Sequence, residues 1–347
     1  MERCVIEAAA GRKKAKLVLK NAQVVNVFTK QVEQADVAVE AGVIAGVGQY
    51  SGEEEVDCTG LYLCPGFVDA HIHVESTMAV PYEFARAVAM SGTTTVVADP
   101  HEIVNVCGAP AVEWLLKASE ALPVDIYWMM PSSVPATPFE TNGAPFTAQE
   151  MAPFAQMGPR VAGLGEVMCY PDVVAGTGEI YGKLALFAHK HIDGHAPGLS
   201  GKALAAYAAA GIETEHECTS FAEAKEKLAA GLAILVREGS AAKNLTAIVE
   251  GLLKEGLPTD RFLFCTDDKH LDDIAREGHI RWNVHQAVQL GMPVVDAICM
   301  ASYNAARVYG LKGVGAIAPG YRADIVLLDD WKQVHGHAVY KDGVPVE

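Results

Sequence analysis

Two histidines separated by one residue, His71 and His73, have a spacing that suits metal chemistry. They lie in the segment FVDAHIHVES, residues 67–76, at the end of an apolar run that follows Pro65 and Gly66. Residues i and i+2 of a strand face the same side, so both imidazoles can bind one cation. Two imidazoles buried on one face also need a polar partner. The pair therefore indicates a metal site.

Six further apolar runs also end near ionisable side chains. Between about residues 65 and 311, eight strand-like runs alternate with helix-like segments. Eight such units predict an α/β fold of the TIM (β/α)8 barrel type, in which the C-terminal ends of the strands meet at one mouth. We therefore expect convergence of the groups at these ends: His71, His73, Asp99, His101, Glu102, Glu166, His195, His216, Arg237, Glu238, Asp267 and Asp268.

Two carboxylates of this set stand beside strongly apolar residues. Glu166 lies in the run RVAGLGEVM, residues 160–168, and Asp267 follows the run FLFC, residues 262–265. A buried ionised carboxylate needs a cation or several hydrogen-bond donors, so we predict that Glu166 binds metal. Asp267 is predicted either to bind a cation or to act as a base with a shifted pKa. Adjacent strand residues face opposite ways, and we expect Asp267 rather than Asp268 to face the mouth.

The two ends of the chain have a different pattern. Residues 1–64 alternate apolar and polar residues around glycine turns, without a clear helix, and residues 312–347 are similar. We expect the two ends to form one small β-sandwich beside a barrel of residues 65–311. An open doubly wound sheet is the alternative to the barrel. The sequence has no GxGxxG or GxxxxGK[ST] loop of the kind that such a sheet often carries.

The amino-acid composition argues against nucleic acids and membranes as binding partners of this protein. The chain has 27 Lys and Arg against 43 Asp and Glu, a net charge of −16, which opposes binding to a nucleic-acid backbone. Its apolar runs are too short for a membrane span, and the order of charged and apolar residues at the N-terminus does not suit a signal peptide. The eight cysteines include no CxxC pair, which indicates reduced thiols. We expect a cytoplasmic protein with a small-molecule substrate and neither a nucleic-acid nor a membrane partner.

Three other catalytic motifs are incomplete in this sequence. His73 and Glu75 form the H-x-E half of a zinc nucleobase deaminase signature, but the PCxxC half is absent. His101 and Glu102 begin an HExxH zinc motif, in which Asn105 occupies the position of the second histidine. No GxSxG elbow of a serine hydrolase occurs. A metal site in this protein would therefore need ligands from the ends of several strands.

The segment PGFVDAHIHVES resembles the first barrel strand of the amidohydrolase superfamily. Members of this superfamily carry an HxH pair, a bridging carboxylate, two further histidines and an aspartate at the strand ends. The segments DGHAPGLSG, residues 193–201, and VREGS, residues 236–240, resemble the bacterial-type adenine deaminase subgroup, and this resemblance runs from about residue 17 to residue 347. It implies hydrolytic deamination of a purine, adenine, to hypoxanthine and ammonia.

The resemblance also implies a site with two divalent metal ions. Imidazole and carboxylate ligands without thiolate suit manganese, iron or zinc, and similar enzymes favour manganese or iron. Glu166 would bridge the two ions, and Asp267 would exchange a proton with the attacking water, so these two carboxylates are the catalytic candidates. The implied metal ligands are His71, His73, Glu166, His195, His216 and Asp267. The candidates for contact with the purine are Glu75, His101, Glu102, Arg237 and Asp268.

Two other functions stay open at this point. Another amidohydrolase that opens a cyclic or small amide, such as a dihydroorotase-like or dipeptidase-like enzyme, would use the same metals. A non-catalytic scaffold would keep the barrel, although it has no physical need for six converging ligands. Members of the subgroup usually continue into a further C-terminal domain, which we expect this chain to lack. We also expect a homo-oligomer, namely a dimer.

Overall fold

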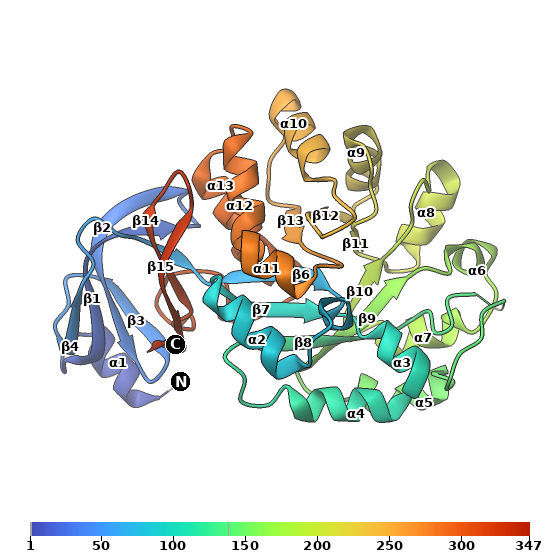
Figure 1. Cartoon of the computed structure of the whole chain (residues 1–347), viewed down its shortest axis with the longest axis horizontal. Coiled ribbons are helices and arrows are strands. Elements are labelled where there is room, and N and C mark those ends of the chain that lie inside the picture. Colours follow the sequence, from blue (N-terminus) through green and yellow to red (C-terminus); the bar gives the residue numbers. More distant parts are fainter. Residues whose placement is uncertain (1, 138) are drawn as a thin grey trace.

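The computed structural model describes residues 2–137 and 139–347 (Figure 1). Eight parallel strands form its inner part, and each of the eight predicted runs contains one of them, so this prediction is confirmed. Among the described residues, every helix is too short or too polar to cross a bilayer. The strands are β6 (Phe67–Ile72), β7 (Thr93–Ala98), β8 (Asp125–Met130), β9 (Val161–Val167), β10 (His191–Gly194), β11 (Thr214–Glu215), β12 (Ala233–Arg237) and β13 (Phe262–Cys265).

These strands form two parallel sheets that curl toward each other. One sheet has the order β10-β9-β8-β7-β6 and the other the order β11-β12-β13. At one junction, the backbone N–H of Asp267 donates to the carbonyl of His71 at 2.9 Å, and that of His73 donates to the carbonyl of Asp267 at 3.1 Å. At the other junction, Glu213 N–H donates to the carbonyl of Ile192 at 3.0 Å. Hydrogen bonds therefore link the two sheets at both edges.

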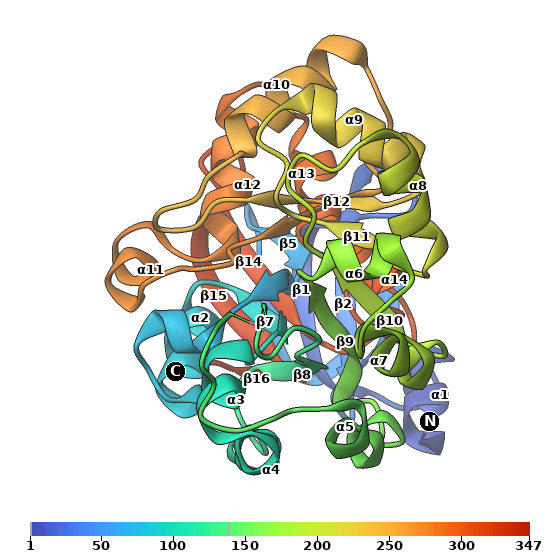
Figure 2. The same ribbon diagram turned by 90° about the vertical axis from the view of Figure 1, so that its right-hand side faces the viewer.

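Helices cover the outer side of the parallel strands (Figures 1 and 2). Large buried side chains such as Phe84, Trp128 and Phe187 belong to one core cluster between helices and strands, whereas Val68 and Met129 belong to a second buried cluster. The elements are α2 (Pro81–Met90), α3 (His101–Cys107), α4 (Ala109–Ala118), α5 (Ala148–Ala155), α6 (Tyr170–Ala175), α7 (Ile180–Phe187), α8 (Gly201–Ala209), α9 (Phe221–Ala229), α10 (Leu245–Glu255), α11 (Leu271–Glu277), α12 (Ile280–Gln289), α13 (Val294–Met300), α14 (Tyr303–Val308) and the 3₁₀ turn η1 (Val74–Thr77).

Strands from both ends of the chain share a second, mixed sheet, on the left in Figure 1. Its order is β16-β15-β14-β5-β1-β2-β3, with β4 paired to β1, and the antiparallel pairing of β14 with β5 joins the two ends. The predicted domain division at residues 64/65 and 311/312 stays a prediction. The strands are β1 (Ala15–Asn26), β2 (Gln31–Glu40), β3 (Val43–Gly48), β4 (Gly52–Asp57), β5 (Tyr62–Pro65), β14 (Ile325–Asp330), β15 (His335–Lys341) and β16 (Val344–Pro345).

The first segment also contains a helix, α1 (Arg3–Ala9), where the sequence pattern indicates no clear helix. Val5 and Ala8 are three residues apart and therefore share one face of this helix. They are buried in a small cluster with Val18 of β1 and Ala38 of β2. Packing against the sheet thus stabilises a helix of seven residues that is too short to be stable alone.

A fully buried ion pair supports the loops after β10 and β11. Lys227 Nζ on α9 lies 3.3 Å from Glu215 Oε2 and 2.8 Å from Glu223 Oε1, and the side chains of Lys227 and Glu215 are both 0% exposed. Glu215 accepts hydrogen bonds from the backbone N–H groups of Ala196 at 2.9 Å and Glu217 at 2.6 Å. One buried carboxylate therefore holds both loops in place.

Replacing Lys227 with methionine is expected to lower the free energy of unfolding by about 3–5 kcal/mol, because the Glu215 carboxylate stays buried without its cation. Urea denaturation followed by circular dichroism measures this change. Lys225→Met is the matched control, since Lys225 lies on the same helix, is 51% exposed and pairs with Glu255 at the surface. The control should change stability by about 1 kcal/mol or less. Equal losses in the two variants would contradict the buried-pair interpretation.

Candidate metal centre

The structure brings the six predicted metal ligands together at the C-terminal ends of the parallel strands. They come from the end of β6, from β9, and from the first one or two residues after β10, β11 and β13. Five of the six are buried, and His195 is partly exposed. Ligand atoms within each of three overlapping groups lie within 4.8 Å of one another: His71, His73 and Glu166; His71, His216 and Asp267; and Glu166, His195 and His216.

Glu166 occupies the centre of this cluster. Its Oε2 lies 2.7 Å from His195 Nδ1 and 3.1 Å from His216 Nε2. Its Oε1 lies 3.6 Å from His73 Nε2 and 3.3 Å from His101 Nδ1. Burial favours the neutral carboxyl, but the hydrogen bonds from His195 and His216 outweigh burial and hold the pKa of Glu166 well below its usual value. The ionised carboxylate thus faces two different sets of imidazoles with its two oxygens.

Asp267 lies on the other side of the two β6 histidines. Its Oδ1 is 3.1 Å from His73 Nε2 and 3.6 Å from His71 Nε2, and its Oδ2 accepts a hydrogen bond from Arg237 at 2.5 Å. Hydrogen bonds from the two histidines outweigh burial and hold the pKa of Asp267 far below its usual value. The backbone φ of Asp267 is 58°, a left-handed value that is uncommon outside glycine and that often marks functional residues.

The geometry of these side chains fits a bound divalent cation. The Nε2 atoms of His71 and His73 lie only 3.2 Å apart, and both also face carboxylate oxygens. Ligand atoms that bind one ion at about 2.0–2.2 Å lie roughly 3–3.6 Å from each other, which matches the spacings in this cluster. His71 Nδ1 is buried and has no hydrogen-bond partner among the described residues. The nitrogen and oxygen donors are those of zinc, iron and manganese sites.

Asp99, at the end of β7, orients two members of the cluster. Its backbone carbonyl lies 2.8 Å from His73 Nδ1, which leaves His73 Nε2 free to face the cluster. Its side-chain Oδ2 accepts a hydrogen bond from the backbone N–H of Glu166 at 2.9 Å. Gly165 permits this contact, since a Cβ at that position would overlap the Asp99 carboxylate. Asp99 therefore orients His73 and Glu166, a role that its position at a strand end did not by itself predict.

Three of the predicted purine contacts lie together beside His73. The His101 ring stacks on the His73 ring with centroids 4.3 Å apart, and His101 Nε2 lies 3.5 Å from Glu102 Oε2. Burial opposes protonation of His101, but the interaction with Glu102 raises its pKa to about 9. Glu75 accepts a hydrogen bond from the N–H of Ile103 at 3.2 Å, and burial together with Glu102 raises the pKa of Glu75 to about 7. One hydrogen-bond donor, His101, and two carboxyl groups, Glu75 and Glu102, thus lie next to the metal-ligand cluster.

The other two predicted purine contacts are held by neighbouring side chains. Arg237 Nη1 donates to both Asp267 and Glu217 at 2.5 Å, so the guanidinium links two carboxylates. Asp268 accepts a hydrogen bond from the hydroxyl of Ser76 in η1. Asp267 thus faces the histidines, whereas Asp268 contacts η1 and also has a carboxylate oxygen within 4.8 Å of ligand atoms of His73 and Asp267.

Glu217 belongs to this site, although sequence reasoning did not select it. Its Oε1 lies 3.5 Å from His216 Nε2 and 3.9 Å from His195 Nδ1. Strict alternation along a strand would place Glu217 opposite His216. However, β11 contains only Thr214–Glu215, so Glu217 lies beyond the strand and the alternation rule does not apply to it. A carboxylate directly after a candidate ligand in the segment EHECTS was the available signal.

Comparisons with known proteins identify the family of this chain. The profile of the amidohydrolase family matches residues 62–346. A curated protein named adenine deaminase from Desulfitobacterium hafniense (strain Y51) is 53% identical over 337 residues, which cover 97% of this chain and 59% of that protein. Adenine deaminase from Kosmotoga olearia is 48% identical over 341 residues, with coverages of 97% and 59%. The chain therefore spans about 59% of the length of these relatives.

A solved structure supports the fold independently. The β-aspartyl dipeptidase from Fervidobacterium islandicum AW-1, crystallised with a β-Asp-Leu dipeptide, superposes with a TM-score of 0.68. The superposition covers 95% of this chain and 96% of the dipeptidase, at 18% sequence identity. At this level of identity, the similarity concerns the fold alone.

Proposed function

The chain belongs to the amidohydrolase family, and on this basis we propose that it binds two divalent ions and deaminates adenine to hypoxanthine and ammonia. The convergence of Glu166, Asp267 and four histidines at the ends of parallel strands carries the proposal. The high identity to proteins named adenine deaminase supports adenine as the substrate.

The proposed ligands divide between the two ions. His71, His73 and Asp267 would hold one ion, His195 and His216 would hold the other, and Glu166 would contact both. When bound, such ions lower the pKa of a water molecule and supply a nucleophile at neutral pH. We propose manganese or iron for this ligand set, with zinc as the alternative.

Asp267 is the proposed general base. Its Oδ1 lies 3.1 Å from His73 Nε2 and its Oδ2 accepts a hydrogen bond from Arg237, so the carboxylate lies beside the proposed ions, where it would accept a proton from the attacking water. It would then return the proton to a purine ring nitrogen or to the departing amine. Arg237 holds Asp267 and Glu217 at once, and we propose that it positions Asp267 rather than binding the purine directly.

Four rim residues are the proposed contacts to the purine: Glu75, His101, Glu102 and Asp268. Adenine presents N–H donors as well as ring-nitrogen acceptors, so it needs partners of both kinds. The carboxylates would accept hydrogen bonds from the exocyclic amine or the ring N–H. A ring N–H of His101 would donate to a ring nitrogen of the purine.

The finer features of the fold are also part of the proposal. We propose that the eight strands close into a (β/α)8 barrel over residues 65–311. The hydrogen bonds that join the two parallel sheets at both edges support this closure. The strands of residues 1–64 and 312–347 would form a β-sandwich beside the barrel. The expected homodimer stays a prediction, which the mass of the protein in solution would test.

The choice of substrate is tested by supplying the purified chain with Mn²⁺ or Fe²⁺ and measuring ammonia release and ultraviolet absorbance. Adenine is expected to turn over, whereas adenosine, dihydroorotate and a β-aspartyl dipeptide are not. Turnover of dihydroorotate or the dipeptide without turnover of adenine would indicate another amidohydrolase. Bound metal without turnover of any substrate would favour a scaffold, and failure to bind metal would contradict every hydrolase proposal.

A further inference from the structure

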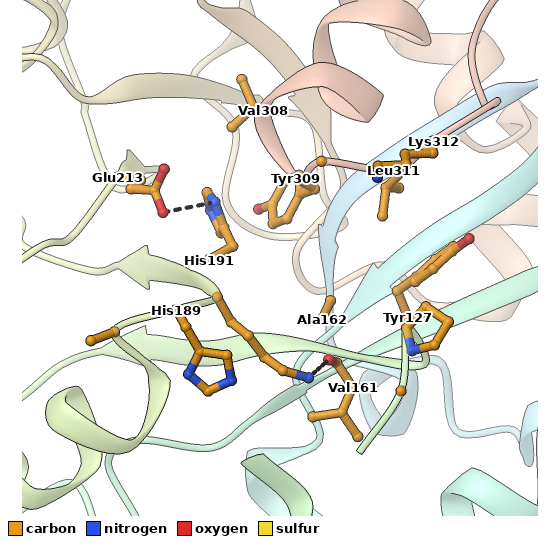
Figure 3. Close-up of a pocket in the computed structure, with 15 residues that line it drawn as sticks. Tyr127, Val161, Ala162, His189, His191, Glu213, Val308, Tyr309, Leu311 and Lys312 are labelled. Carbon is orange, nitrogen blue, oxygen red and sulfur yellow. Dashed lines mark hydrogen bonds and ion pairs between the residues drawn. The ribbon is translucent and has the colours of Figure 1, made fainter. Parts of the chain in front are cut away.

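A depression of about 930 Å³ lies at the end of the parallel strands opposite the metal-ligand cluster. Its lining includes Val161 and His191, which begin β9 and β10, and Glu213, which precedes β11. Figure 3 shows His191 between Glu213 and the ring of Tyr309 in this depression. From this depression, a series of hydrogen-bonded polar side chains extends toward the interior of the parallel strands.

Asp193 of β10 follows His191 in this series of polar side chains. Its Oδ1 accepts hydrogen bonds from Thr214 Oγ1 at 2.6 Å and Tyr309 Oη at 2.8 Å, and lies 3.0 Å from His191 Nε2. His191 Nδ1 in turn lies 3.3 Å from Glu213 Oε1 (Figure 3). Burial opposes protonation of His191, but its two carboxylate neighbours raise its pKa to about 9. Three groups therefore fix one oxygen of Asp193 from the side of the depression.

The other oxygen of Asp193 faces a member of the metal-ligand cluster. Asp193 Oδ2 lies 4.0 Å from His71 Nδ1, and both side chains are 1% exposed. Neither atom has a hydrogen-bond partner among the described residues. Buried polar atoms without partners are uncommon, and two that face each other call for an explanation.

His71 needs a hydrogen-bond acceptor at this position if it binds metal. Its Nε2 faces the cluster, at 3.2 Å from His73 Nε2 and 3.6 Å from Asp267 Oδ1. A neutral imidazole that binds metal through Nε2 carries its proton on Nδ1. For His73, the carbonyl of Asp99 lies 2.8 Å from the corresponding nitrogen. For His71, Asp193 Oδ2 is the acceptor that faces Nδ1.

We propose that Asp193 is a positioning residue that accepts the Nδ1 proton of His71 when His71 binds metal. The two atoms must approach by about 1 Å to reach hydrogen-bond distance. His191, Thr214 and Tyr309 hold the carboxylate from the opposite side, so the far end of the strands contributes to the metal site. A carboxylate partner fixes the tautomer of a metal-bound histidine and strengthens it as a ligand. The inference rests on the proposed binding of metal.

The test measures Mn²⁺ affinity by competition with a chromophoric chelator, which does not depend on turnover. Asp193→Asn keeps the shape of the side chain and removes its charge, and it is expected to weaken Mn²⁺ binding by about 10–100-fold. Tyr309→Phe removes one hydrogen bond to Asp193 and is expected to weaken binding by a smaller factor. His189→Gln is the control, because exposed His189 lines the same depression without bonding to Asp193, and its affinity should equal that of the wild type.

The possible outcomes separate the inference from the proposed function. A wild-type chain that does not bind Mn²⁺ would contradict both. Wild-type affinity in folded Asp193→Asn, even with reduced thermal stability, would mean that Asp193 only neutralises His191, and it would overturn the inference alone. If Asp193→Asn does not fold, the test depends on Tyr309→Phe, in which unchanged Mn²⁺ affinity would overturn the inference.

Discussion

The Asp267→Asn variant is expected to lose turnover of adenine, with a fall in the rate of ammonia release of about 10²–10⁴-fold. The amide keeps the size of the side chain and one oxygen ligand, but it cannot accept a proton at neutral pH. The metal content should therefore fall only partly. This combination, with activity lost and metal partly retained, distinguishes a base from a residue that only binds metal.

Ammonia release and elemental analysis of the same sample measure the two quantities for Asp267→Asn. Asp272→Asn is the matched control, because its carboxylate is 76% exposed on α11 and pairs with Arg276 at 3.5 Å. The control should keep both the activity and the metal content of the wild type. Unchanged turnover in Asp267→Asn would remove Asp267 from the proposed mechanism.

The Glu166→Gln variant is expected to lose most of its bound metal and all measurable turnover. One carboxylate oxygen of Glu166 faces His195 and His216, and the other oxygen faces His73. Glutamine removes the negative charge and places an N–H group where an oxygen faced imidazole nitrogens. The loss in metal affinity should exceed the roughly 10–100-fold loss that follows removal of an outer hydrogen-bond partner.

Elemental analysis after gel filtration tests the Glu166 prediction, with circular dichroism as a check that the variant folds. Glu238→Gln is a suitable control, because Glu238 is only 12% exposed yet pairs with Lys243 and lies outside the ligand groups. The control should retain metal as the wild type does. Wild-type metal content in Glu166→Gln would exclude a central role for this carboxylate.

The sequence was most informative where local patterns repeat. Each parallel strand is a short apolar run between helical segments, so all eight strands could be located. The first residues after such a run lie at a strand end, and for this reason Asp267 and His216 could be selected without a structure. The spacing of His71 and His73 gave the same kind of local signal.

Features that depend on distant contacts could not be predicted in this way. Helix α1 is stable because Val5 packs against β1 and β2, and no local pattern reports that contact. Asp193 attracts attention only when its neighbours from other strands are known. The hydrogen bonds that link the two parallel sheets also join segments that are far apart in the chain.

The backbone pairing of Asp267 with His71 and His73 has a consequence for the folding of the chain. The first and last parallel strands must meet before this pairing can form, so a partly folded chain has only fragments of the ligand set. A divalent ion would therefore bind the native state in strong preference to any intermediate. By linkage, the ion then adds to the free energy of unfolding in proportion to the logarithm of its free concentration once that concentration exceeds the dissociation constant. If the proposed metal binding holds, the supply of metal during synthesis would therefore act on the yield of native chains.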